Sequence, residues 1–203
     1  MIRAGLAAPR RAAQVTALVL GAALLRALFL PAGDGVSTAV FAACLLGISL
    51  WYPLPDPPHK GEGDLGGPAH MVKMRWGRGA SILVGLAVGA ILLAPLISGP
   101  LTTRPLAAFW SWAAVAAVVA TLEETTIRGV LFRGWQEEAG PAVAIVAGAI
   151  VFALIHLPRY GFAAMPLDLA VGLALGGLRA LTGRVFPCAV AHTIADWGAW
   201  FWA

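Results

Sequence analysis

The chain has 203 residues, of which 60% are hydrophobic and only 12% are charged. Soluble domains carry about 25% charged residues, so this composition excludes an ordinary water-soluble fold, as does the mean hydropathy of +0.82. The formal net charge is +4, but the basic residues are scattered between apolar runs, which argues against a nucleic-acid partner. Cys44 and Cys188 both lie within apolar runs, so they indicate neither a disulfide framework nor a zinc knuckle.

Seven apolar segments follow one another along the chain, separated by Gly- and Pro-rich stretches that are typical of turns. A helix needs about 20 mostly apolar residues to cross a hydrocarbon core of about 30 Å. The first segment is too long for a cleaved signal, whose apolar region has about 7–15 residues. The predicted spans are 12–31, 35–52, 80–98, 105–128, 141–157, 165–182 and 185–202. We therefore expect an all-α, polytopic transmembrane helix bundle of about seven spans.

The one long connection between these segments runs from Pro53 to Gly79 and is rich in Pro and Gly. It contains His59 and His70, but these histidines are not three or four residues apart. A closed metal site also needs three or four ligands, so we do not expect one there. The composition favours a flexible surface loop.

The distribution of Lys and Arg predicts the orientation in the membrane. With a cytoplasmic N-terminus, ten of the 14 lie on the cytoplasmic side, two (Arg104 and Arg159) on the other, and two (Arg26 and Arg128) within spans. This bias predicts a multi-pass membrane protein with its N-terminus in the cytoplasm. We interpret Arg26, near the end of the first span, as a side chain that extends to the interface and has no further function.

Ionisable residues inside the predicted spans are the candidates for function, because each costs about 2.5–3.5 kcal/mol on insertion. Glu124 and Arg128 are four residues apart on one helix face, which favours an ion pair, and His192 and Asp196 repeat that interval. The residues in question are Glu123, Glu124, Arg128, His156, Asp168, Arg179, His192 and Asp196.

Hairpin geometry predicts that several of these side chains meet inside the bilayer. At ~1.5 Å per residue, Glu123, Glu124 and His156 lie about 22–26 Å from the turn near residues 138–140. His192 and Asp196 lie about 14–20 Å from the turn near Gly183, on the same side of the membrane. All of them could therefore surround one buried cavity.

Two carboxylates and two imidazoles in one cavity can hydrolyse a bond in either of two ways. A glutamate can take a proton from water while the histidines orient the water or stabilise an oxyanion. Alternatively, the same groups could hold a divalent metal such as zinc, whose bound water is the nucleophile. A third interpretation is purely structural: the Glu124–Arg128 pair neutralises itself so that the helix can insert.

Three sequence motifs on successive predicted spans resemble those of a known family. They are Glu123-Glu124-Thr125-Thr126-Ile127-Arg128, Phe152-Ala153-Leu154-Ile155-His156 and His192-Thr193-Ile194-Ala195-Asp196. In this order they resemble the EExxxR, FxxxH and HxxxN motifs of the CPBP intramembrane proteases, also called the CAAX-processing and bacteriocin-immunity (Abi) family. The resemblance covers about residues 105–200. It implies that 105–203 form a catalytic helical core, preceded in 1–104 by transmembrane helices and a cytoplasmic loop at about 53–79.

The resemblance also implies roles for these residues. Glu123, our first choice, or Glu124 would activate water, and Arg128 would hold the neighbouring carboxylate. His156 would contact the water or the first acid, and His192 with residue 196 would stabilise the oxyanion. If a metal is present, Glu123, His156 and His192 would be its ligands.

Asp196 stands where the family usually has Asn, and the chain contains no Asn. An ionised carboxylate would repel an oxyanion. Asp196 is therefore expected to be protonated, to orient His192 through a hydrogen bond, or to join a metal shell.

The implied function is an endopeptidase that cuts near the C-terminus of a membrane-anchored protein or peptide, in the plasma membrane of a bacterium. Two other functions use the same features. A non-catalytic bacteriocin-immunity or scaffolding protein would need only the bundle, and a proton-coupled transporter would use the ionisable groups as a relay. The sequence shows no paired, interrupted halves of the kind that many transporters have.

Overall fold

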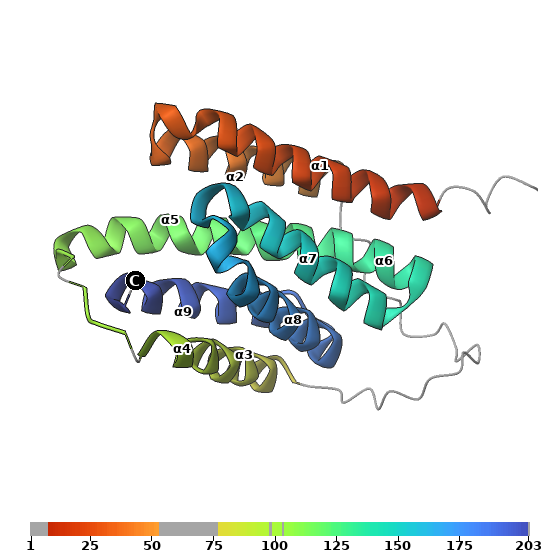
Figure 1. Ribbon diagram of the computed structural model, residues 1–203. Helices are drawn as coiled ribbons and strands as arrows, with labels where there is room; N and C mark the ends of the chain where they lie inside the picture. The colour runs from red at the N-terminus through yellow and green to blue at the C-terminus, as the bar shows by residue number, and fades with distance from the viewer. Residues whose placement is uncertain (1–7, 53–76, 98, 103, 203) are drawn as a thin grey trace, which may run out of the picture.

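The computed structural model describes residues 8–52, 77–97, 99–102 and 104–202, and every regular element among them is helical. The all-α prediction is therefore confirmed for these residues (Figure 1). The proposed loop at 53–79, with His59 and His70, lies outside the described residues except for its last three.

The helices follow the predicted spans in order. Their bounds are α1 Ala8–Phe29, η1 Leu30–Ala32, α2 Asp34–Trp51, α3 Arg78–Leu92, α4 Ala94–Ile97, α5 Leu106–Glu124, η2 Thr125–Leu131, α6 Phe132–Ala139, α7 Pro141–Tyr160, η3 Phe162–Ala164, α8 Met165–Thr182 and α9 Phe186–Trp202.

Five of these helical segments are long and apolar enough to cross a membrane, which is the property that the sequence predicts. They are 11–32, 34–51, 106–139, 141–160 and 162–182. The two remaining predicted spans also fold as helices, but α3 has 15 residues and α9 has 17, so both are shorter than expected.

The fourth predicted span differs most from the structure, because its helix does not end at residue 128. It continues through η2, a π-helix, into α6 and ends at Ala139. At the start of the π-helix, Thr125 Oγ1 donates to the Thr121 carbonyl at 2.7 Å and Thr126 Oγ1 donates to the Leu122 carbonyl at 2.8 Å. Such bonds loosen the regular helical ladder. The wider turn follows directly on Glu123 and Glu124.

Two glycines make the turns that the sequence predicts. Gly140 has a φ of 89° between α6 and α7, and Gly183 has a φ of 67° between α8 and α9. Glycine adopts such backbone angles without a steric penalty. These turns fold α7 back against α6 and bring α9 against α8.

Close helix packing fixes the positions of α7 and α9. A Cβ atom added to Gly172 of α8 would lie 2.7 Å from the Ala149 Cα atom of α7, and one added to Gly85 of α3 would lie 2.7 Å from the Pro187 carbonyl oxygen of α9. Small residues at membrane helix crossings allow backbones to approach this closely. In Figure 1, α9 accordingly lies between α3 and α5, and it packs against both.

Candidate active site

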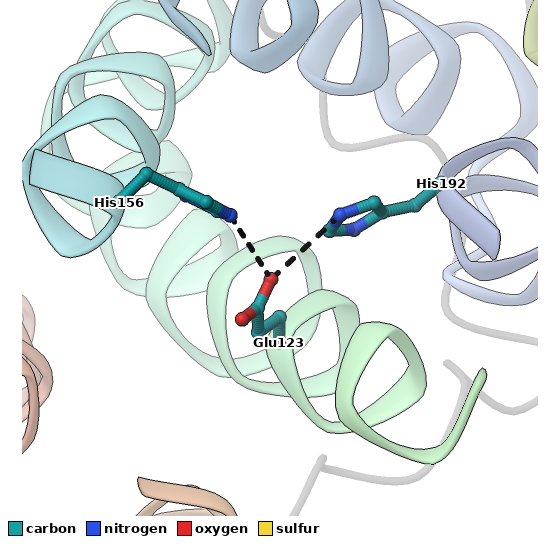
Figure 2. A group of neighbouring side chains, drawn as sticks. All are labelled: Glu123, His156 and His192. Carbon is teal, nitrogen blue, oxygen red and sulfur yellow. Dashed lines mark ion pairs between the residues drawn. The ribbon is translucent and has the colours of Figure 1, made fainter. Parts of the chain in front are cut away.

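Three buried side chains from three helices converge at the middle of the bundle. Glu123 stands at the end of α5, His156 on α7 and His192 on α9. Glu123 Oε2 lies 3.9 Å from His156 Nε2 and 3.8 Å from His192 Nε2. Figure 2 shows the two imidazole rings on opposite sides of the carboxylate, each with a ring nitrogen directed at it. The structure thus brings together the groups that hairpin geometry predicted would meet.

The outer nitrogen of each imidazole has a hydrogen-bond partner that fixes the ring. His156 Nδ1 lies 2.8 Å from the Phe152 carbonyl oxygen, which can only accept, so Nδ1 carries the proton. His192 Nδ1 donates in the same way to Glu124 Oε1 at 3.0 Å. In the neutral rings both Nε2 atoms therefore present a lone pair toward Glu123.

The second carboxylate, Glu124, is held in a buried ion pair. Arg128 Nη1 lies 3.1 Å from Glu124 Oε1, and the two side chains are 1% and 0% exposed. Arg128 Nη2 donates to the Gly172 carbonyl oxygen at 3.2 Å, and the guanidinium lies 4.7 Å from the centre of the Phe152 ring. The predicted i, i+4 pair is thus present, and it connects α5 and the π-helix to α7, α8 and α9.

Asp196 lies at the edge of this cluster. Its Oδ1 atom is 3.7 Å from His192 Nε2, which is too long for a hydrogen bond, and its side chain is 38% exposed. Glu124, not Asp196, orients His192 in this structure. Arg179 contacts the backbone of this region: its Nε atom donates a hydrogen bond to the Arg128 carbonyl oxygen at 2.9 Å.

A cavity of about 910 Å³ opens beside the cluster, between α1, α2, α5, α7 and α9. Glu123, His156, His192 and Asp196 line it. Much of the remaining wall is apolar, with Trp112, Val115 and Val119 of α5 among its residues. An apolar cavity with a few convergent polar groups is the usual form of a ligand site.

Two residues that sequence reasoning missed also line this cavity. Arg26 is only 5% exposed and lines it, which differs from the prediction that its side chain extends to the interface. Tyr160 stacks on the His156 ring with centroids 5.8 Å apart. Tyr160 follows His156 by four residues, so the helical interval that relates Glu124 to Arg128 could have identified it.

The cluster could also hold a metal ion. Glu123, His156 and His192 each offer one possible ligand atom, and these three atoms lie within 4.8 Å of one another. Three protein ligands with a fourth open position are typical of catalytic zinc, and ligating histidines are usually held through their other nitrogen. The carboxylate-to-imidazole distances of 3.8 and 3.9 Å exceed the roughly 3.4 Å expected between tetrahedral zinc ligands. The residues fit a metal in type and orientation.

In a comparison with protein families, the model described as Rce1-like, type II CAAX prenyl endopeptidase Rce1-like, matches residues 104–198. This range contains Glu123, Glu124, Arg128, His156, His192 and Asp196. The match confirms the family resemblance that the three motifs predicted. No curated protein and no solved structure matches the chain.

We predict that Arg128→Met lowers the free energy of unfolding by about 3–5 kcal/mol, because it leaves the Glu124 carboxylate buried without its partner. Arg133→Met is the matched control, since Arg133 forms an i, i+4 pair with Glu137 that is 38% and 50% exposed. An exposed pair contributes about 0–1 kcal/mol. Denaturant unfolding in detergent micelles measures both variants, and equal losses would contradict the importance of burial.

Proposed function

We propose that this chain is an intramembrane endopeptidase, because residues 104–198 match the Rce1-like model of type II CAAX prenyl endopeptidases. Its substrate is a membrane-anchored protein or peptide, which it cuts near the C-terminus. The observation that carries the proposal is the Glu123 carboxylate, buried in a cavity and faced by two imidazole nitrogens at 3.8 and 3.9 Å.

In the proposed mechanism, a water molecule occupies the space between Glu123 and the two Nε2 atoms. Glu123 takes a proton from this water as the oxygen attacks the carbonyl carbon of the peptide bond, and it later delivers the proton to the leaving amine nitrogen. His156, fixed by the Phe152 carbonyl, orients the water by accepting its other hydrogen.

The oxyanion that forms on the substrate requires a donor. In its doubly protonated form, His192 donates through Nε2 while Nδ1 stays bonded to Glu124. The carboxylates of Glu123, Glu124 and Asp196, all within 4 Å, balance that positive charge. Asp196 then acts through His192 and not by contact with the oxyanion.

A divalent metal is the alternative way to activate water in this site. Glu123, His156 and His192 would hold it, and the metal would supply Lewis-acid activation of the nucleophile. Glu124 would then fix His192 as an outer partner.

We predict that Glu123→Gln lowers cleavage at least about 100-fold, because the amide cannot act as a general base. His156→Ala and His192→Ala are expected to lose activity to a similar extent. The measurement is mass spectrometry of products from proteoliposomes supplied with membrane-anchored C-terminal peptides, including prenylated ones. Glu137→Gln, at an exposed glutamate distant from the cavity, is the control. Cleavage that is unchanged in all three site variants would overturn the catalytic role proposed for these side chains.

The glutamate mechanism predicts that activity survives removal of metal. Purified protein is dialysed against a chelator, its metal content is measured by mass spectrometry, and cleavage is assayed before and after addition of zinc. Activity that disappears with the metal and returns with zinc would instead support the metal mechanism.

We further propose that the N-terminus is cytoplasmic and that the cavity end near Tyr160 faces outward in a bacterial plasma membrane. In a background without Cys44 and Cys188, Phe162→Cys would then react with a membrane-impermeant maleimide added to spheroplasts, because Phe162 is 78% exposed. Glu137→Cys, at the other end of α7's hairpin, would react only after permeabilisation. The reverse labelling pattern would refute this orientation.

A further inference from the structure

Arg26 is a buried cation that forms no ion pair with any residue that the structure describes. It lies in α1 and is 5% exposed, with its guanidinium 4.8 Å from the centre of the Phe41 ring. Its Nε atom is buried and has no hydrogen-bond partner, and no ion pair to it occurs within the described part of the chain. A cation in a membrane span is costly, so one that remains unpaired marks a position prepared for a ligand.

The position of Arg26 relates it to the site. Arg26 and Glu123 line the same cavity, together with Arg159 and Tyr160. These last two follow His156 on α7 by three and four residues, which places them about 4.5–6 Å further along the helix. Arg159 Nη2 is already 3.2 Å from Asp34 Oδ2. Among the described residues that line that end of the cavity, Arg26 is therefore the cation without an ion-pair partner.

We propose that Arg26 binds the terminal α-carboxylate of the substrate, an inference that rests on the endopeptidase function proposed above. A substrate cut near its C-terminus brings a carboxylate into the cavity, and Glu123 repels that group from the site of hydrolysis. The planar guanidinium matches a carboxylate through two parallel hydrogen bonds. The apolar wall of α5 receives the side chains between the cut bond and the chain end.

This contact would set the length of the peptide that is removed. With the substrate carboxylate at Arg26 and the carbonyl carbon of the cut bond at Glu123, the distance between Arg26 and Glu123 selects how many residues are released. Arg26 is then a binding residue that decides which peptides are cut, while the three-residue cluster performs the chemistry.

The test compares one cleavable membrane-anchored peptide made in two forms, with a free C-terminal carboxylate and with a carboxamide. We expect the wild-type chain to cut the free acid roughly 10-fold to 100-fold more efficiently in kcat/KM, because the amide loses a charged hydrogen-bond pair. In Arg26→Gln this ratio should fall to about 1, and Arg26→Lys should retain part of it. Because both peptides are measured on one preparation, loss of folded protein does not alter the ratio.

Arg104→Gln is the matched control. Arg104 also lies over an aromatic ring, at 5.2 Å from the centre of Trp200, but it does not line the cavity. Its ratio should equal that of the wild type.

The outcomes separate the two proposals. If the wild type cuts neither peptide, the endopeptidase function fails and this inference fails with it. If it cuts acid and amide equally, or if Arg26→Gln keeps the wild-type ratio, only the carboxylate contact is overturned. An unchanged ratio in Arg26→Gln would be expected if Arg26 bound a lipid phosphate instead.

Discussion

The Arg128 guanidinium holds together the parts of the site that come from different helices. It forms an ion pair with Glu124 and lies over the Phe152 ring. It also donates a hydrogen bond to the backbone carbonyl oxygen of Gly172. Glu124 in turn accepts a hydrogen bond from His192 Nδ1. One buried cation therefore connects the π-helix with α5, α7, α8 and α9. Because a buried charge is stable only with well-placed partners, its position constrains all of them.

This arrangement separates the roles of two adjacent glutamates. Glu124 has its charge compensated by Arg128 and serves to orient His192. Glu123, turned by about 100° on the same helix, faces the cavity, where its nearest polar neighbours are the two Nε2 atoms. Neighbouring carboxylates in different environments can thus perform different tasks.

The sequence predicts the helices, their order and the convergence of Glu123, His156 and His192, because these follow from apolar length and from helical rise. It also predicts the Glu124–Arg128 pair from their spacing of four residues. The π-helix escapes prediction because the local bonds of Thr125 and Thr126 also occur in regular helices, and the hydrogen bond of 2.9 Å between Thr126 and Ser49 of α2 forms only in the folded bundle. The interval between His192 and Asp196 was correct as a spacing, but Glu124 occupies the orienting position that this interval alone would give to Asp196. Arg26 was misinterpreted because proximity to a span end does not reveal which side chains cover it.

The cavity is built from both halves of the chain, although the family match begins at residue 104. Glu123, His156 and His192 all lie inside the matched region, whereas Arg26, Thr38 and Ala42 contribute wall from α1 and α2. Changes in the first helical hairpin could therefore remodel the shape and charge of the chamber without disturbing the groups beside Glu123. In such an architecture, the lining of the cavity can diversify in one hairpin while the Glu123 cluster stays constant in the remaining bundle.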